Sequence, residues 1–254
     1  MVKIDFNKKG IKLYNADCFD VFKNIKDKSI DLFVLDLPFG SYGGTSCKWD
    51  NCLDLKEMWI NIKRIMKPET VICFFCNTKF GYQLIKSNEK WFKYDLIYQK
   101  RRRVGFLSAN RRQLRNHENI YIFKNKQGIY NAQKTQGEKP YKTVNKGVGY
   151  YREKKGDYSQ TLTENKGDRH PTSIIDNTIL KYNNPYKTIH QTEKPVGLLE
   201  YLIKTYSNEG DLIMDFTMGS ASCGIACYNT KRKFIGIEKD DEIYKLAKER
   251  IIQH

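Results

Sequence analysis

The stretch Ile30–Phe39 reads IDLFVLDLPF, and the rest of the chain can be arranged around it. Its first six residues form an almost continuous apolar run, which is typical of a strand buried on both faces of a parallel sheet. Asp36 follows at the carboxyl end of that strand, where open α/β sheets bind their ligands. The stretch therefore predicts a buried strand that delivers a carboxylate to a ligand site.

The residues Asp36, Leu37, Pro38 and Phe39 have two interpretations. In the functional one, the carboxylate accepts a hydrogen bond from an exocyclic amine, and the Phe39 ring stacks on the heterocycle that carries this amine. In the structural one, they form an ordinary turn, because Asp and Pro are common where strands end. A second motif far along the chain favours the functional interpretation.

The composition restricts the class of protein. The chain has 254 residues, 40% of them hydrophobic, which is enough for one sizeable α/β domain that carries an insertion. A formal net charge of +16 indicates a polyanionic partner, with nucleic acid first and a membrane surface second. Cysteine pairs lie inside apolar runs and indicate reduced thiols. Because no signal region or membrane-spanning run is present, we expect a soluble, cytoplasmic protein without membrane association.

Strands and helices alternate along the chain. Apolar runs predict further strands at residues 11–14, 70–76, 94–98, 119–123, 211–215 and 233–238. Periodic apolar positions predict helices at residues 54–66, 80–90, 195–206 and 240–251. This alternation predicts an α/β fold with a doubly wound, mostly parallel sheet. A glycine-rich loop at residues 40–45 predicts mobility over a substrate.

The second motif follows the strand that ends at Asp215. The turn after it contains Gly219 and small residues, so a ligand can lie close to the backbone. Glu238 ends the next strand about twenty residues further on, where an acidic side chain typically holds two ribose hydroxyls. Together they predict a site for a nucleoside-type cofactor. The G-x-G-x-x-G pattern of a dinucleotide site is missing.

These motifs resemble those of the β-class of amino-methyltransferases that act on DNA, and they occur in that family's order. Residues 36–39 resemble its D-P-P-Y-type catalytic motif, and residues 190–195 (HQTEKP) its H-P-T-x-K-P element. Residues 215–222 with 234–238 resemble the cofactor motif and its acidic partner. Residues 115–118 (RNHE) resemble the segment before target recognition. The resemblance implies a Rossmann-like methyltransferase fold with permuted motif order and an inserted basic target-recognition region.

The resemblance also implies an activity, which is methylation of N6 of a flipped adenine in DNA by S-adenosylmethionine. Asp36 and the Leu37 carbonyl would accept hydrogen bonds from the target amine, and Phe39 would stack on the base. The implied cofactor-binding residues are Asp17, Cys18, Thr192, Lys194, Pro195, Asp215, Phe216, Thr217, Gly219, Ser220 and Glu238. From the residues alone, Asp17 fits the N-cap of the helix that follows it.

Several departures from the family pattern leave alternatives open. Phe39 replaces a tyrosine and Leu37 a proline, while Thr217 stands where the family often has phenylalanine. Ala221 stands where the family usually has glycine and would add a β-carbon beside the cofactor. A nucleic-acid-binding protein with a degenerate cofactor site is therefore an alternative. N4-cytosine methylation and methylation of RNA or a small molecule are others, although Asp36 favours adenine because the family usually has serine for cytosine.

The middle of the chain is strongly basic. Between residues 100 and 115 no acidic residue occurs, and the candidate DNA-binding residues there are Arg101, Arg102, Arg103, Arg111, Arg112 and Arg115. We therefore divide the chain into a catalytic half (1–99), a target-recognition region (100–188) and a cofactor-binding half (189–254). The alternative for the basic insertion is a solvated, partly disordered segment. Expected partners are double-stranded DNA, a second copy in a homodimer and a cognate restriction endonuclease, with association to the nucleoid through DNA.

Overall fold

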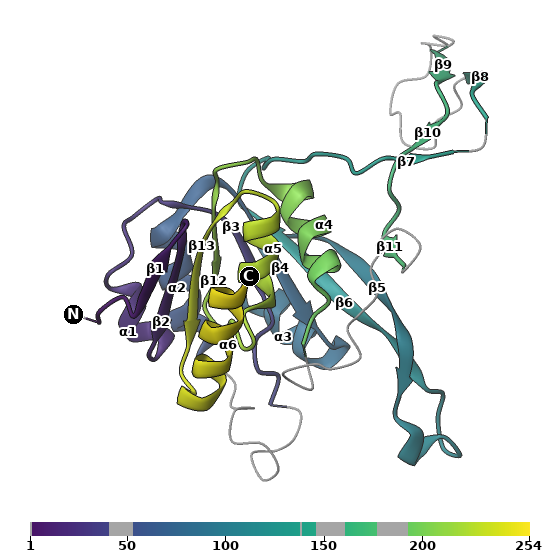
Figure 1. Cartoon of the computed structure of the whole chain (residues 1–254). Helices are drawn as coiled ribbons and strands as arrows, with labels where there is room; N and C mark the ends of the chain where they lie inside the picture. The colour runs from purple at the N-terminus through teal and green to yellow at the C-terminus, as the bar shows by residue number, and fades with distance from the viewer. Residues whose placement is uncertain (1, 41–52, 138, 146–160, 177–192) are drawn as a thin grey trace. The chain divides into compact units, whose positions relative to one another are not determined.

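The computed structural model of this protein describes residues 2–40, 53–137, 139–145, 161–176 and 193–254 (Figure 1). It divides into two compact units, a sheet unit of Met1–Asn131 with Ser173–His254 and a small unit of Ala132–Thr172. Most of the predicted glycine-rich loop and the predicted cofactor residue Thr192 lie outside the described residues.

The sheet unit is organised around nine strands in the order β1-β2-β13-β12-β3-β4-β6-β5-β11. Their bounds are β1 (Phe6–Lys8), β2 (Ile11–Asn15), β3 (Ile30–Leu35), β4 (Met66–Cys76), β5 (Phe92–Val104), β6 (Arg115–Lys124), β11 (Ile174–Ile175), β12 (Leu212–Asp215) and β13 (Lys233–Glu238). The pairs β2–β13, β13–β12, β12–β3, β3–β4 and β5–β11 are parallel, and β1–β2, β4–β6 and β5–β6 are antiparallel. The prediction of a mostly parallel sheet is confirmed.

Strand β3 shows why the apolar run at its position forms a central strand. Leu32 and Val34 pack into one cluster of buried side chains, whereas Phe33 and Leu35 pack into a second. Successive side chains of a strand point to opposite faces, so an uninterrupted apolar run buries both faces at once.

Helices cover both faces of this sheet and make it doubly wound. The cluster that contains Phe33 includes side chains of α1 (Cys18–Phe22), α2 (Leu55–Ile65) and α3 (Thr78–Ser87). The other cluster includes side chains of α4 (Val196–Tyr206), α5 (Ser222–Asn229) and α6 (Asp241–Gln253), which lie together on one face in Figure 1. No helix among the described residues is long and apolar enough to cross a membrane.

Strands β5 and β6 continue past the rest of the sheet. β6 pairs with β4 only as far as Asn119, and β5 pairs with β11 only at Ile97 and Tyr98. Beyond these points the two strands pair only with each other, up to the pair Val104–Arg115, and a short 3₁₀ helix, η2 (Phe106–Ser108), lies in the connection. We call residues 99–118 the ribbon. The prediction at residues 94–98 covered only part of the first half of β5.

The small unit contains two antiparallel strand pairs. β7 (Thr135–Gln136) pairs with β10 (Asp168–Arg169), and β8 (Tyr141–Asn145) pairs with β9 (Thr161–Asn165). The guanidinium of Arg169 lies 5.2 Å from the centre of the Tyr141 ring, and Lys134 forms a 2.7 Å ion pair with Asp168. Polar and cation–π contacts thus connect the strands in the described part of this unit.

Candidate active site

The candidate active site lies where the winding of the sheet reverses. β3 and β12 are neighbours, but the chain leaves β3 toward β4 on one side and leaves β12 toward β13 on the other. Ligands of open α/β sheets bind at such a switch point, beyond the carboxyl ends of the strands. Asp36 follows β3 and Asp215 ends β12, so two carboxyl groups from distant parts of the chain meet there.

The side chains in the turn after β3 differ in how deeply they are buried. The Leu37 side chain is buried in the apolar cluster beneath the site, so only its backbone can face a ligand. Phe39 is half-buried, and its ring packs on Phe80 of α3 with the ring centroids 5.2 Å apart and an interplanar angle of 33°. Phe80 thereby fixes the orientation of the aromatic ring that we predicted to stack on a base.

Asp36 is held by an unexpected partner, Lys194, which immediately precedes Pro195 and α4. The Lys194 ammonium donates a hydrogen bond to Asp36 Oδ2 and lies 3.7 Å from Glu118 Oε2. Glu118 comes from β6 and also accepts a 2.5 Å hydrogen bond from Lys100 of β5. Two carboxylates and two ammonium groups therefore alternate at the base of the ribbon, and this arrangement neutralises four charges in a mostly buried place.

Burial and ion pairing set the protonation of this cluster. Burial raises the pKa of Asp36, and the positive charge of Lys194 opposes this effect without cancelling it. Burial opposes the charged form of Lys194, but the carboxylates of Asp36 and Glu118 outweigh it and raise the pKa of the ammonium group. Lys194 and Lys100 likewise overcome burial at Glu118 and lower the pKa of its carboxyl. Lys194 therefore stays charged and favours the ionised form of Asp36.

The turn after β12 forms the second part of the site. The Thr217 N–H donates a 3.1 Å hydrogen bond to Asp215 Oδ1, and the Gly219 N–H donates one of 3.1 Å to Glu238 Oε2. Gly219 has φ +50°, and no atom lies within 4 Å of the position that a β-carbon would take there. The Thr217 hydroxyl also donates a 3.3 Å hydrogen bond to the backbone oxygen of Asp36. This contact joins the two turns of the site directly.

Burial raises the pKa of both acids at this turn. The pKa of Asp215 reaches about 8, because its carboxyl is buried and lies near the negative charges of Asp36 and Glu238. The pKa of Glu238 is also raised by burial, although the backbone N–H groups of Asp240 and Gly219 moderate the shift. An acid with a pKa near 8 at a strand end is the kind of perturbed group that clusters at functional sites.

A polar network supports the turn after β12. Arg250 of α6 forms a 2.7 Å ion pair with Glu193 and donates hydrogen bonds to the Ser220 carbonyl at 3.1 Å and the Ser222 hydroxyl at 3.0 Å. Ser222 in turn donates a 3.2 Å hydrogen bond to Glu193. Within this network Ser220 is buried, so its side chain supports the turn.

The structure distributes the other predicted cofactor residues between the edge of the site and the core. Asp17 caps α1 by accepting a 3.0 Å hydrogen bond from the Phe19 N–H, as the sequence indicated, and pairs with Lys239 at 3.0 Å. Cys18 is buried, and burial raises the pKa of its thiol to about 12. Phe216 packs edge-on against Phe22 in the core. Only the backbones of Cys18 and Phe216 are therefore available to a ligand.

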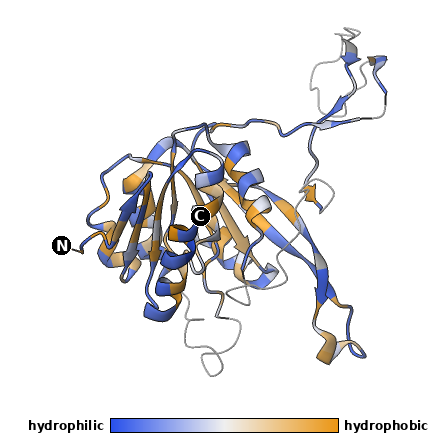
Figure 2. Ribbon diagram, viewed as in Figure 1, coloured by the Kyte–Doolittle hydropathy of each residue, from blue (hydrophilic) through white to orange (hydrophobic). Residues whose placement is uncertain are grey.

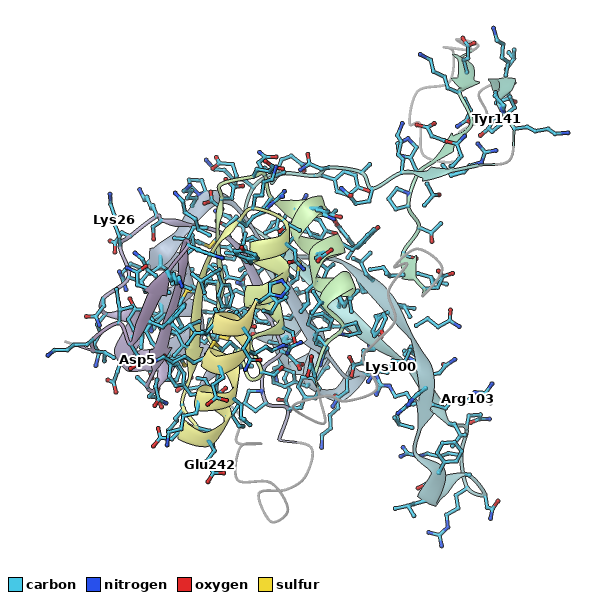
Figure 3. All side chains as sticks on the ribbon, viewed as in Figure 1. Asp5, Lys26, Lys100, Arg103, Tyr141 and Glu242 are labelled. Carbon is cyan, nitrogen blue, oxygen red and sulfur yellow. The ribbon has the colours of Figure 1, made fainter. Side chains whose placement is uncertain are left out.

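The predicted DNA-binding arginines fall into two groups. Arg102, Arg103, Arg111 and Arg112 are exposed on the ribbon, where Figure 3 labels Arg103. Arg115 is half-buried at the start of β6 and donates a 3.0 Å hydrogen bond to the His117 carbonyl, and the side chain of Arg101 lies outside the described residues. The positive charge of Arg115 also helps to lower the pKa of the Glu118 carboxyl.

Sequence reasoning missed four residues at this site, namely Phe80, Lys100, Glu118 and Arg250. Phe80 and Lys100 lie far from the two motifs in the sequence, whereas Glu118 belongs to the segment that resembles the family and Arg250 to the helix that follows Glu238. A charged residue directly before a predicted strand, as at Glu118, was the available signal. In the sequence analysis, Glu118 entered only as part of the segment 115–118 that resembles the family, and no role at the site was assigned to it.

The comparisons with known proteins agree with this geometry. The chain belongs to the N6_N4_Mtase family, described as DNA methylase, whose model matches residues 30–249. It is 25% identical over 253 residues to type II methyltransferase M.HpaI of Haemophilus parainfluenzae, covering 94% of this chain and 74% of that protein. It is also 25% identical over 259 residues to type II methyltransferase M1.MboII of Moraxella bovis, covering 93% and 94%. The predicted resemblance to DNA methyltransferases is thus confirmed.

Solved structures share the fold. The M1.HpyAVI–SAM complex aligns with a TM-score of 0.60 at 23% identity, covering 94% of this chain and 99% of that one. The cytosine-N4-specific PvuII DNA methyltransferase aligns with a TM-score of 0.65 at 14% identity, covering 98% and 90%. The predicted methyltransferase fold is therefore confirmed.

Proposed function

We propose that this protein transfers a methyl group from S-adenosylmethionine to N6 of a flipped adenine in double-stranded DNA. One observation carries the proposal, the hydrogen bond from the Thr217 hydroxyl to the Asp36 backbone oxygen. It joins the strand end that offers an acceptor for an amine to the turn that fits a nucleoside-type cofactor. An amine held at Asp36 would then lie beside a group held on the β12 turn.

The side chains at Asp36 suit an aromatic amine. The lone pair of N6 is delocalised into the adenine ring, which makes the amine a poor nucleophile. The Asp36 carboxylate and the Leu37 carbonyl would accept its two N–H bonds and localise electron density on the nitrogen. Lys194 favours the ionised form of this carboxylate and holds it in place. Catalysis then consists mainly of orientation and preorganised electrostatics.

The turn after β12 fits S-adenosylmethionine, which would supply an electrophilic methyl group when bound. The open space at Gly219 lets a ligand lie against the backbone. The Glu238 carboxylate accepts two backbone hydrogen bonds, and its remaining lone pairs suit ribose hydroxyls. Asp215, Thr217 and Lys194 remain candidate cofactor residues beside it.

The aromatic ring of Phe39 suits the base. One of its sides packs on Phe80, which leaves the ring preoriented for stacking. Extrusion of a base from the duplex costs roughly a few kcal/mol, which stacking and phosphate contacts partly offset. The acid at Asp36, where the resemblance expects serine in cytosine enzymes, supports adenine as the target.

Partners and location follow from the same proposal. Exposed arginines of the ribbon would contact DNA phosphates, and DNA binding would place the cytoplasmic protein at the nucleoid. Relatives are named type II methyltransferases, which supports a cognate restriction endonuclease as partner. A homodimer remains part of the proposal.

The test is incorporation of a labelled methyl group from S-adenosylmethionine into unmethylated genomic DNA, followed by digestion and identification of the nucleoside. We expect N6-methyladenine with the native chain and none with Asp36→Ala. Asp20→Ala, which removes an exposed acid of α1, is the matched control and should keep full activity. N4-methylcytosine would overturn the target base, and an absence of both incorporation and cofactor binding would overturn the enzyme assignment.

A further inference from the structure

The far end of the ribbon exposes large apolar side chains. Phe106 is 68% exposed and Leu107 is 106% exposed, while the neighbouring Val104 is 47% exposed. Figure 2 shows hydrophobic residues at this end of the ribbon, beyond a hydrophilic stretch. A group of apolar side chains that protrudes into water indicates a surface that another molecule covers.

Backbone hydrogen bonds fix the conformation of this end. The Ser108 N–H donates to the Gly105 carbonyl at 2.9 Å, and the Arg112 N–H donates to the Ser108 carbonyl at 3.0 Å. Gly105 has φ +97°, a conformation that side chains other than glycine rarely adopt. Phe106 and Leu107 are thus presented on a preformed turn, so that their insertion into a partner orders little additional chain.

Charge identifies the partner. Residues 100–115 contain seven Lys and Arg residues and no Asp or Glu. The four exposed arginines Arg102, Arg103, Arg111 and Arg112 form no ion pair within the described part of the chain. A second copy of this surface would repel the first, whereas a polyanion would neutralise it. Nucleic acid is therefore the fitting occupant.

The ribbon connects this apolar end to the candidate active site. Its strand β6 begins at Arg115 and reaches Glu118, the partner of Lys194, after three residues, which span roughly 10 Å in a strand. A two-stranded ribbon fits the major groove of duplex DNA. Proteins that deform DNA insert side chains such as Phe and Leu between base pairs.

We propose that Phe106 and Leu107 form an apolar wedge that enters the base stack of duplex DNA beside the target base. This inference rests on the proposed function. The wedge occupies stacking space next to the position that the extruded base leaves, while the four exposed arginines hold the flanking phosphates. The wedge thereby lowers the free-energy cost of base flipping without contacting the transferred methyl group.

The test compares Phe106→Ala/Leu107→Ala with Ile60→Ala, which truncates a 60% exposed side chain of α2. Substrates are two duplexes that carry the methylated site identified in genomic DNA, one with the target base paired and one with it mispaired. A mispaired base costs less to flip. We expect the double variant to lose about tenfold or more in kcat/KM on the paired duplex, where each tenfold equals about 1.4 kcal/mol. On the mispaired duplex we expect it to approach the native rate.

A second readout does not depend on methyl transfer. Permanganate oxidation detects unstacked thymines in DNA bound by the native chain or by each variant, at saturating protein. We expect enhanced oxidation with the native chain and Ile60→Ala and none with the double variant, together with an unchanged salt dependence of binding. Equal loss on both duplexes, unchanged kcat/KM or unchanged oxidation would overturn the wedge. A native chain that unstacks DNA but transfers no methyl group would instead overturn the proposed function.

Discussion

The ammonium group of Lys194 donates a hydrogen bond to the carboxylate of Asp36, 158 residues earlier in the chain. Only 11% of the Lys194 side chain is exposed, and a second carboxylate, that of Glu118, lies 3.7 Å away. Loss of one partner from a buried ion pair leaves an uncompensated charge, which is strongly destabilising. Lys194 therefore holds the carboxylate of Asp36 in place and favours its ionised form.

Replacement of Lys194 by methionine should raise the pKa of Asp36, because the opposing positive charge disappears while burial remains. The acid limb of the pH–rate profile should move to higher pH, and Lys194→Arg should restore it. The free energy of unfolding should fall by about 3 kcal/mol. Lys23→Met, which removes an exposed ion pair with Asp20, should cost about 1 kcal/mol at most and leave the profile in place. An unshifted profile in Lys194→Met would contradict this role.

Removal of the Phe39 ring should weaken catalysis on DNA more than cofactor binding. Phe39→Ala removes the surface on which the base stacks, and stacking on an aromatic side chain is worth about 1–3 kcal/mol per base. We expect kcat/KM for DNA to fall by about 10–100-fold, while Phe39→Tyr, which keeps the ring, stays near the native value. Steady-state kinetics and calorimetric titration of the cofactor distinguish the two effects. Equal activity of the alanine and tyrosine variants would refute stacking.

Substitution of the two small residues in the turn after β12, Gly219 and Ala221, should affect cofactor binding to different extents. Ala221 has φ +57° and is fully buried in the core, whereas Gly219 has φ +50° and open space around it. Gly219→Ala should place a methyl group where the cofactor lies and weaken its binding by about tenfold or more, at a folding cost of about 1 kcal/mol. Ala221→Gly should leave cofactor affinity within about threefold of the native value, because its β-carbon already lies in the core.

Titration calorimetry of both variants tests this contrast. A large gain in affinity for Ala221→Gly would show that the native alanine obstructs the cofactor site. Thermal unfolding provides the control for folding in each case.

Ionisation of Asp215 should lower the free energy of unfolding of the unliganded protein as the pH rises from about 4 toward 8. Its pKa is about 8 in the folded chain and near 3.8 without burial, so the folded state binds more protons throughout this interval. This contribution is fully present below the unfolded pKa and is lost as the pH approaches the folded value, with a slope of at most about 1.4 kcal/mol per pH unit. Asp215→Asn keeps the acceptor for the Thr217 N–H and should abolish this slope. Denaturant unfolding of both chains between pH 5 and 8.5 measures it, and equal slopes would refute the assignment.

The exposed arginines of the ribbon should determine how steeply salt weakens DNA binding. Each arginine that neutralises a phosphate contributes about 0.9 to the slope of log K against log salt concentration. Alanine substitution of Arg103 or Arg111 should reduce the slope by about that amount each, irrespective of DNA sequence. Arg64→Ala removes an arginine of α2 that pairs with Asp27, and it should leave the slope unchanged. A slope that stays constant in the ribbon variants would exclude phosphate contact.

The local sequence was sufficient to predict those strands whose conformation depends mainly on neighbouring residues. The strands at residues 30–35, 212–215 and 233–238 were predicted within about one residue, because uninterrupted apolar runs between turns have few other stable conformations. The cap at Asp17 was predictable because an aspartate before a helix accepts hydrogen bonds from the free backbone N–H groups of the first turn.

The ribbon and the contacts among Asp36, Glu118, Lys100 and Lys194 were not predictable from the local sequence. Arg102 and Arg103 lie in β5, in an irregular part of its pairing with β6, and no alternation of apolar residues marks this stretch as a strand. The contact of Lys194 with Asp36 depends on the arrangement of the whole sheet. The predicted division at residues 99 and 100 falls inside β5, whereas the separate compact unit spans Ala132–Thr172.

The strand order also constrains the protein during its synthesis. β12 and β13 are translated last, yet they lie between β2 and β3, which are among the first. Until both have left the ribosome, the early strands lack their central neighbours, and the turns of Asp36 and Thr217 cannot meet across 181 residues of chain. Long-range pairing of this kind is intrinsically slow. A nascent chain therefore contains both strands of its ribbon before it can form the contact between Asp36 and Thr217.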